Sequence, residues 1–353
     1  MSNVPITLAC GFYDRMHALY TGEIKPAGID LNFMAIDDPR QIFDRMGGGL
    51  EFDASEMSLS EHVTKLVAGN SPFVAVPVFI SRVFRHQFIF INTESGIKSP
   101  KDLEGRRVGV PLFVQTAAVY IRGMLQHDHG VDLSSIKWIQ GAMEHPGTHG
   151  KPSVLPLLKK IDLEQNSSGK SLNRLLEDGE IDAMITATIP EPYGRNPRIQ
   201  RLFPNFREVE AEYFKRTKIF PIMHVLAIKR AVYERHPFVA TSLYNACCES
   251  MALAIAKMRD VGALRYMLPW LVADFHEIDQ VFGNAFWPYG VDENRETLEA
   301  LVTYLYEQAM IPKTIPIEDL FVPTYGYPNV GDQKSGREGW STLRRNEPET
   351  RGS

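Results

Sequence analysis

The sequence predicts an α/β protein built as two lobes with largely parallel sheets, followed by a helical C-terminal part. Three observations carry this prediction. Strand-like segments alternate with helical segments over roughly the first 230 residues, which is typical of α/β domains. The 353 residues exceed what one ordinary hydrophobic core accommodates. From Pro237 onward the pattern is mainly helical.

The first segments already show the alternation. Residues 5–10 are a short apolar run that predicts a strand, and a polar turn follows at 11–15. Residues 29–34 alternate between apolar and polar side chains, as a half-buried strand does. Helical spacing over 39–46 ends at a run of glycines, and 52–57 predicts another short strand.

A capping box predicts the next helix, because Ser58 and Glu61 are spaced like an N-cap residue and its N3 partner. Two β-rich runs follow, 73–80 and 88–92, and they flank the polar insert 81–86. A loop follows at 93–96, and we expect the crossover between the lobes in this region.

The second lobe continues the same alternation. Ser99 is followed by a proline and, two residues later, an acid, which predicts a short helix. The later elements are expected to be strand 107–110, a helix from about 115 to 130, strand 136–139, helix 171–178 and strand 181–187.

The last third of the chain returns to the first lobe and then becomes helical. Residues 221–228 predict a strand that contains His224, and a long helix follows from 237 to about 258. Asp292 can cap a final amphipathic helix. Residues 324–353, rich in Gly, Pro and charge, predict a loosely ordered tail.

Composition excludes several classes of protein. The net charge of −5 gives no basic field for nucleic acid or anionic lipid. Cys10, Cys247 and Cys248 form neither a disulfide framework nor a zinc knuckle. No signal peptide and no apolar run of about 18 residues is recognised. We therefore expect a cytoplasmic protein that binds neither nucleic acid nor membrane.

Common catalytic motifs are missing, which weighs against several enzyme classes. The sequence contains no G-x-S-x-G, no Walker A motif, no G-x-G-x-x-G after a strand and no H-E-x-x-H. The close histidine pairs, 127/129 and 145/149, lack the spacing of helical metal ligands. No metal ligand is assigned, although a divalent metal stays open.

Two polar clusters follow strand ends, where ligands are often bound. In the first, Arg15 could grip a carboxylate while Tyr13 and Asp14 bond hydroxyl groups. In the second, two arginines and His86, all within 81–86, could converge on a dianionic ligand; the alternative is a solvated surface turn.

Four further candidate site residues occur outside these clusters. His224 is either a hydrogen-bonded core histidine or a tuned acid–base group. Glu56 is either a loop acid or a carboxylate facing the site. The helix that begins near Thr116 offers its N-terminus to an anion. Trp287 is interpreted as part of a packed aromatic turn; the alternative is that its ring packs against an aromatic ligand.

Longer segments of the chain resemble known families. Residues 99–111, 179–187 and 221–237 are similar to segments of type II periplasmic-binding-protein folds. Over about residues 5–323 the chain resembles the 4,5-dihydroxyphthalate decarboxylase family. That resemblance lies in YDR (13–15), SEMSLSEHV (55–63), RVFRH (82–86), QTAAVYIRGML (115–125) and WPYGVDENRETLEALVTYLYEQ (287–308).

The resemblance implies two α/β lobes that hold a ligand in the cleft between them and close by hinge motion. Lobe one would combine 1–92 with 220–323, and lobe two would span 93–219. The implied activity is that of a carboxy-lyase without an organic cofactor. It would convert a dihydroxylated aromatic dicarboxylate, 4,5-dihydroxyphthalate, into protocatechuate and carbon dioxide by protonating a ring carbon.

Within this reading, His86 or His224 protonates carbon, and Glu56 or Asp14 assists ionisation of a ring hydroxyl. Arg82 and Arg85 mainly position the carboxylate that stays, since a tight clamp on the departing one would stabilise the ground state. Arg15 and the start of the helix at Thr116 are further anion contacts. The full set of expected substrate contacts is Tyr13, Arg15, Ser55, Arg82, Arg85, Thr116 and Trp287.

Two alternatives remain. This fold usually serves as an extracytoplasmic solute receptor, so a non-catalytic binding protein for a small aromatic carboxylate is the second hypothesis; the missing leader argues against it. An enzyme that builds a pyrimidine from its own histidine is a weaker third, because no cluster rich in cysteine and histidine occurs. Association of identical chains is left open.

Overall fold

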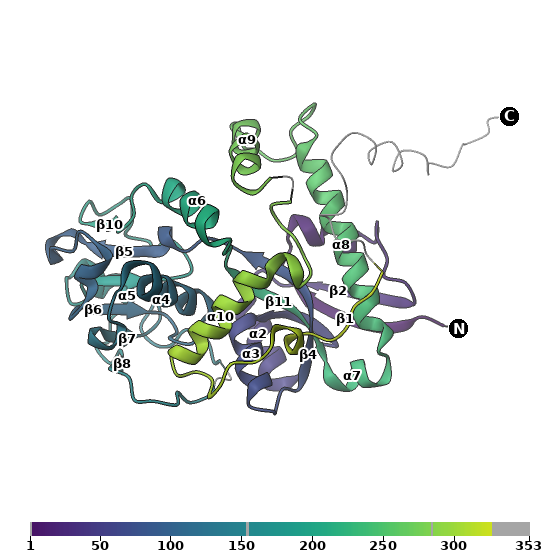
Figure 1. The fold of residues 1–353 in the computed structure, drawn as a ribbon, viewed down its shortest axis with the longest axis horizontal. Coiled ribbons are helices and arrows are strands. Elements are labelled where there is room, and N and C mark those ends of the chain that lie inside the picture. Colours follow the sequence, from purple (N-terminus) through teal and green to yellow (C-terminus); the bar gives the residue numbers. More distant parts are fainter. Residues whose placement is uncertain (1, 153–154, 284, 327–353) are drawn as a thin grey trace.

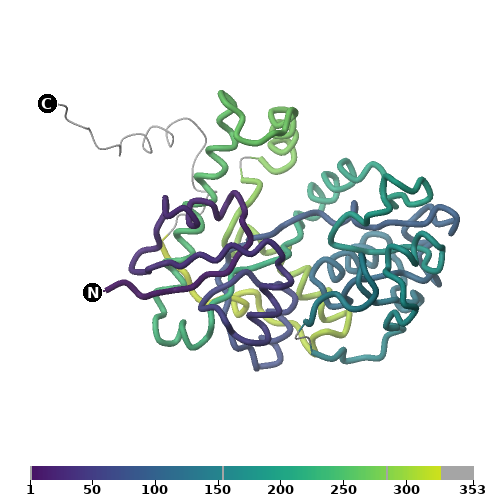
Figure 2. The backbone as a smooth tube through the Cα atoms, turned by 180° about the vertical axis from the view of Figure 1, so that it is seen from behind, coloured from purple at the N-terminus to yellow at the C-terminus, as the bar shows by residue number. Residues whose placement is uncertain are grey.

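The computed structural model describes residues 2–152, 155–283 and 285–326. Two separate β-sheets form two lobes that lie side by side (Figures 1 and 2). The first sheet has the strand order β2-β1-β3-β11-β4 and the second the order β10-β5-β9-β6-β7-β8. The predicted two-lobed α/β architecture is therefore present.

The first sheet is built from the N-terminal strands and one returning strand. Its strands are β1 (Val4–Cys10), β2 (Ile29–Ala35), β3 (Ala54–Ser58), β4 (Phe73–Arg82) and β11 (Ile222–Lys229). Strand β1 runs parallel to β2 and β3, whereas β11 runs antiparallel to β3 and β4. The associated helices are α1 (His17–Thr21), α2 (Pro39–Gly49), α3 (Leu59–Val67) and α7 (Arg230–Arg235).

The second sheet contains six shorter strands. They are β5 (Ile89–Asn92), β6 (Arg107–Val110), β7 (Lys137–Gln140), β8 (Leu163–Gln165), β9 (Ala183–Ile185) and β10 (Ile199–Arg201). Its helices are α4 (Thr116–His129), α5 (Leu172–Glu177) and α6 (Phe206–Thr217). The helix predicted after Ser99 is only a short 3₁₀ turn, Pro100–Leu103, although both bonds of its capping box form.

The chain crosses between the sheets at residues 83–88 and returns at 218–221. The predicted lobe boundary at residue 92 assigns β5 to the first lobe, whereas β5 pairs with β9 and β10 in the second sheet. Both crossover strands, β5 and β11, run antiparallel to their neighbours. The sheets are therefore mixed rather than largely parallel, because each crossover enters its new sheet from the opposite end.

The C-terminal part is helical, as predicted. It contains α8 (Phe238–Arg259), α9 (Leu271–Phe282) and α10 (Arg295–Glu307). Helix α10 packs against α3 of one lobe and α4 of the other. Its N-cap is Asn294 rather than the predicted Asp292, which lies in a preceding 3₁₀ turn. The predicted loose tail falls almost entirely outside the described residues.

Helix α8 meets the length and composition of a membrane span, with a mean hydropathy of 1.3 over its most apolar 18 residues. However, 56% of that window is buried inside the protein. Cys247, Met251 and other apolar side chains of α8 belong to the main hydrophobic core. A helix that lies in a protein core can have the same length and apolar composition, and the burial of α8 is typical of such a helix.

Candidate active site

A buried carboxylate on β3 forms the centre of the site. Glu56 is 0% exposed, and its Oε1 lies 2.5 Å from Nδ1 of His224 and 2.9 Å from the Tyr13 hydroxyl. Its Oε2 accepts a hydrogen bond of 3.1 Å from the backbone N–H of Gly11. Strand pairing explains the contact, because β3 and β11 are adjacent and His224 pairs with Ser58, two residues from Glu56 on the same face.

The donors around Glu56 keep it ionised. Burial by itself raises the pKa of this carboxyl, but His224, Gly11 and Tyr13 outweigh burial and hold the pKa below its usual value. Burial and the negative Glu56 raise the pKa of Tyr13, so its phenol stays protonated and donates. The site thus contains a desolvated carboxylate held by His224, Tyr13 and Gly11, and the thiol of Cys10 lies 3.7 Å from its Oε2 as a fourth, weaker donor.

This arrangement leaves one nitrogen of His224 available. Nδ1 faces Glu56, the ring packs edge-on against Phe43 at 4.8 Å, and 18% of the side chain is exposed. Across the described residues, Nε2 has no hydrogen-bond partner. A carboxylate that accepts Nδ1–H fixes the tautomer and stabilises the imidazolium. His224 can therefore present Nε2–H to a bound molecule as an acid.

The guanidinium of Arg15 lies between two aromatic rings. Its Cζ is 4.3 Å from the centre of the Tyr13 ring and 4.8 Å from that of Trp287. Nε donates to the Ile80 carbonyl at 2.5 Å, and Nη1 is 3.0 Å from Asp14. Within the described ranges Nη2 makes no hydrogen bond. Arg15 is thus a rigidly held cation with donor capacity left for an anion.

An irregular strand holds this arginine in place. Residues 77–80 of β4 pair with no residue of β11, and Pro77 has no N–H to donate. The carbonyls of this segment are therefore free for other donors. The carbonyl of Phe79 accepts a hydrogen bond of 3.0 Å from Nε1 of Trp287, and the carbonyl of Ile80 accepts one from Nε of Arg15. The interruption of the ladder thereby fixes Arg15 and one of its two aromatic walls, Trp287, whereas the other wall, Tyr13, is held by Glu56.

The predicted arginines of the insert lie in the crossover. Arg82 donates to the carbonyls of Phe220 (2.8 Å) and Pro288 (3.2 Å). Arg85 donates to Sδ of Met223 and to the Ala187 carbonyl. Burial lowers the pKa of each to about 9, so both remain cationic at neutral pH. They join chain segments, and the solvated-turn alternative does not apply because both are buried.

His86 lies beside these arginines, away from Glu56. Its ring is buried between Phe203 (5.4 Å) and Tyr213 (5.0 Å), and burial lowers its pKa to about 3. The nearest carboxylate oxygen, on Glu210, is 3.9 Å from its Nδ1. A neutral, enclosed imidazole is poorly suited to donate a proton. This placement favours His224 as the acid.

Thr116 occupies the contact between the two lobes. Its hydroxyl lies 3.0 Å from that of Ser58 and 2.9 Å from that of Ser60, and it accepts the backbone N–H of Ser60 at 3.1 Å. The predicted capping role of Ser58 is wrong, because its side chain makes no cap bond to α3. The hydroxyls instead join the N-termini of α3 and α4.

Of the remaining predicted residues, Asp14 lies at the site and Ser55 does not. Asp14 is ion-paired with Arg15 at the site, with 26% of its side chain exposed. Ser55 points to the face of β3 opposite Glu56, is fully buried, and its hydroxyl has no partner among the described residues. The structure thus brings together Tyr13, Asp14, Arg15, Glu56, His224 and Trp287. Thr116 borders this group, because its hydroxyl bonds Ser58, the cross-strand partner of His224. The remaining four, Ser55, Arg82, Arg85 and His86, make their contacts elsewhere.

Sequence reasoning missed three contributors. Ser81 pairs with His224 across the ladder and is half-buried beside it. Phe43 packs on the imidazole, and the N–H of Gly11 bonds the carboxylate. Ser81 lies inside the polar insert 81–86, which the sequence already marks as a candidate. Phe43 and the N–H of Gly11 could not be recognised, because apolar helix residues and backbone amides occur throughout a sequence and do not indicate a function.

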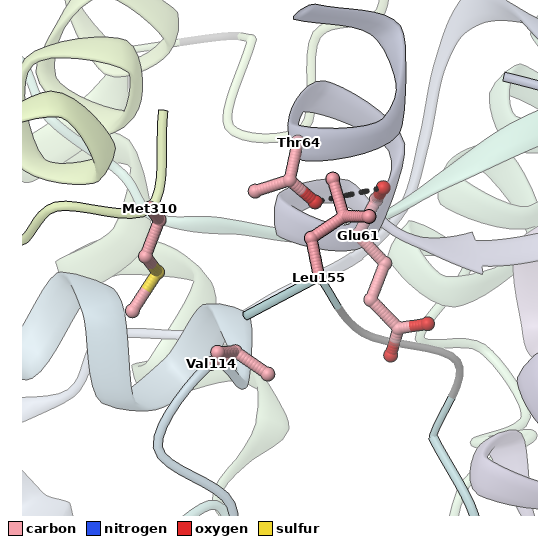
Figure 3. A pocket seen from close by; sticks show the side chains of 5 residues that line it. All are labelled: Glu61, Thr64, Val114, Leu155 and Met310. Carbon is pink, nitrogen blue, oxygen red and sulfur yellow. Dashed lines mark hydrogen bonds between the residues drawn. The ribbon is translucent and has the colours of Figure 1, made fainter. Parts of the chain in front are cut away.

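A small cavity between the lobes does not serve as the site. It is lined by Glu61 and Thr64 of α3 together with Val114, Leu155 and Met310 (Figure 3). Its volume of about 10 Å³ is close to the space that one water needs. In the described ranges, no group of three or more His, Cys, Asp or Glu side chains is placed to hold a metal ion.

Comparison with known proteins gives consistent relatives. The chain is 35% identical to the 4,5-dihydroxyphthalate decarboxylase of Comamonas testosteroni over 324 residues, which cover 92% of this chain and 98% of the relative. It is 36% identical to the Pseudomonas putida protein of the same name over 216 residues, 61% of this chain and 83% of the relative. The NMT1/THI5-like family matches residues 22–151.

Solved structures show the fold. Protein AF1704 from Archaeoglobus fulgidus aligns with a TM-score of 0.51 at 14% identity, covering 87% of this chain and 98% of that structure. The periplasmic aliphatic sulphonate binding protein SsuA from Escherichia coli gives the same score and identity, with coverages of 91% and 98%. The fold is thus periplasmic-binding-protein-like. By its sequence, the chain belongs to the 4,5-dihydroxyphthalate decarboxylase family, a family of carboxy-lyases.

Proposed function

We propose that this protein decarboxylates 4,5-dihydroxyphthalate to protocatechuate and carbon dioxide. The observation that carries the proposal is the buried Glu56–His224 pair, which leaves Nε2 of the histidine free at a partly exposed position. The family relationship supports the reaction class. Arg15, held rigidly next to this pair through Tyr13, supplies a cation for a carboxylate substrate.

The substrate's own electrons drive the reaction. Each carboxylate is para to a ring hydroxyl, which pushes electron density onto the carbon that bears the carboxylate. The proton on Nε2 of His224 moves to that carbon, and the ring loses its aromaticity. The C–C bond to the carboxylate then breaks, its electron pair returns to the ring, and carbon dioxide leaves. His224 regains a proton from solvent.

The protein stabilises the protonated acid and orients the ring. Glu56 offsets the charge of the imidazolium, and the Tyr13 and Gly11 donors hold Glu56 in place. Arg15 binds the carboxylate that stays, because a tight bond to the departing one would oppose the loss of its charge. Asp14, bonded to Arg15, orients the guanidinium and is the carboxylate proposed to accept a hydroxyl proton.

Turnover is the direct test. Purified protein is incubated with 4,5-dihydroxyphthalate, and carbon dioxide and protocatechuate are measured together. One equivalent of each per substrate is expected. Tight binding without turnover would instead favour the second hypothesis, a solute-binding protein, which the shared fold with SsuA keeps open. The cytoplasmic location also remains a proposal, tested by fractionating cells that express the full-length protein.

A further inference from the structure

The connection between α8 and α9 exposes an unusual amount of apolar surface. We call residues 260–272 the tip; it stands away from both sheets in Figures 1 and 2. Arg265 is its only basic residue and Asp260 its only acidic one. Met267 is 100% exposed and Trp270 77%. The other large apolar side chains that it exposes by about half are Val261, Leu264, Leu268 and Val272.

The tip is braced rather than loose. At its base Arg259 of α8 forms two hydrogen bonds to Asp279 of α9, one of 2.9 Å to Oδ2 and one of 2.5 Å to Oδ1. From the other lobe, Arg207 of α6 lies 2.7 Å from both Asp274 and Glu277. Rigid apolar surface loses little conformational entropy when it is covered, which favours association.

The exposed area is large enough for a stable interface. The six apolar side chains together present on the order of 600–700 Å², compared with about 300–600 Å² for the largest apolar patch of a typical monomeric protein. A standard interface buries about 800 Å² on each partner. The tip and its immediate surroundings therefore provide about what one half of such an interface needs.

The charges around the tip indicate what covers it. Most of them are already paired within the chain: Lys257 with Glu23, Arg259 with Asp279, and Arg207 with Asp274 and Glu277. An anionic membrane would be matched by a border of unpaired basic residues, which this border is not. A border that is neutralised within each chain lets the same apolar patch of two copies meet across a two-fold axis without burying an unpaired charge.

We propose that the tip is the surface through which two copies of this chain associate. The inference goes beyond the proposed function and does not depend on it. It also bears on the site, because Tyr266 of the tip lies close enough to Asp14 and Arg15 for their charges to affect its pKa, which burial raises. The paired tips would therefore lie close to Asp14 and Arg15.

Sedimentation velocity of the full chain tests the proposal. A species of twice 39.9 kDa is expected, dissociating at micromolar concentrations or below, as interfaces of this size do. Trp270→Ala should weaken association by about 30-fold or more, as loss of a central tryptophan does. A wild-type chain that stays monomeric up to about 100 μM would overturn the proposal, since interfaces of this size bind more tightly.

A matched pair of variants tests the location. Leu268, in the tip, is 52% exposed, and Leu158, in the other lobe, is 54% exposed. Leu268→Asp should abolish the dimer and Leu158→Asp should leave it intact, with unchanged far-UV circular dichroism in both. Equal effects of the two changes would refute the assignment. So would co-sedimentation of monomers with phosphatidylglycerol–phosphatidylcholine vesicles, which would identify the tip as a membrane surface.

Discussion

Replacing Glu56 by glutamine is the sharpest test of the proposed mechanism. The amide keeps the size of the carboxylate, but it removes the negative charge and places an NH₂ group where Tyr13, Gly11 and His224 all donate. One of these donors then faces another donor. His224 either loses its Nδ1 partner or must accept from the amide through an unprotonated Nδ1. In both cases the imidazolium, whose Nε2–H is the proposed acid, loses the carboxylate that stabilises it.

The size of the effect follows from the geometry. The two charges of the pair are centred about 4 Å apart and are almost fully desolvated, which corresponds to about 4 kcal/mol at an effective dielectric of about 20. If this stabilisation of the imidazolium is lost, kcat should fall by about 10³-fold. KM should change little, since Glu56 is buried beneath His224 and touches no substrate in the proposed arrangement.

The assay is steady-state release of carbon dioxide over a range of 4,5-dihydroxyphthalate concentrations, with urea unfolding to show that the variant is folded. Asp53→Asn is the control. Asp53 lies just before β3 and accepts one backbone N–H, from Thr7, at 2.9 Å, but it does not contact His224. A folded Glu56→Gln variant with kcat within about threefold of wild type would refute the mechanism, because the expected loss is near 10³.

Three further outcomes are expected. Arg15→Lys should raise KM by about 10–100-fold and change kcat less, because it loses one charge-assisted hydrogen bond and the aromatic stacking; the reverse split would exclude a binding role. His224→Asn should lower kcat by about 10²–10⁴-fold, whereas His86→Gln should stay within about tenfold; equal rates in both variants would remove His224 from proton transfer. Buried His62, whose pKa burial lowers to about 4, makes the folded protein bind fewer protons than the unfolded chain between about pH 4 and 6.5. Its contribution to the free energy of unfolding, about 3 kcal/mol, should therefore be lost as pH falls through that range; in urea titrations at several pH values, a His62→Asn variant with the same acid sensitivity would contradict this.

Continuous apolar runs made the strands of the first sheet predictable. The predicted strand at 221–228 matches β11 within one residue, and 73–80 lies within β4. Pairing direction was not predictable, because the antiparallel entry of β5 and β11 follows from the path between the lobes. The cap at Ser58 failed for a similar reason, since its hydroxyl bonds Thr116 of the other lobe, 58 residues away.

The site could be predicted only in part. Tyr13 and His224 lie 43 and 168 residues from Glu56 along the chain, and only the strand order brings them together. His86 and His224 looked alike in sequence because both lie next to apolar segments. The difference between them comes from α6, whose Tyr213 helps to cover the ring of His86.

The reacting groups are all positioned by the first sheet. Glu56 and His224 sit on adjacent strands of the first sheet, and the carbonyls of β4 in that sheet fix Arg15 and Trp287. A relative movement of the second lobe would therefore leave acid, carboxylate and cation in register. In this protein, lobe closure would then control solvent and substrate exchange, while the chemistry stays assembled throughout the cycle.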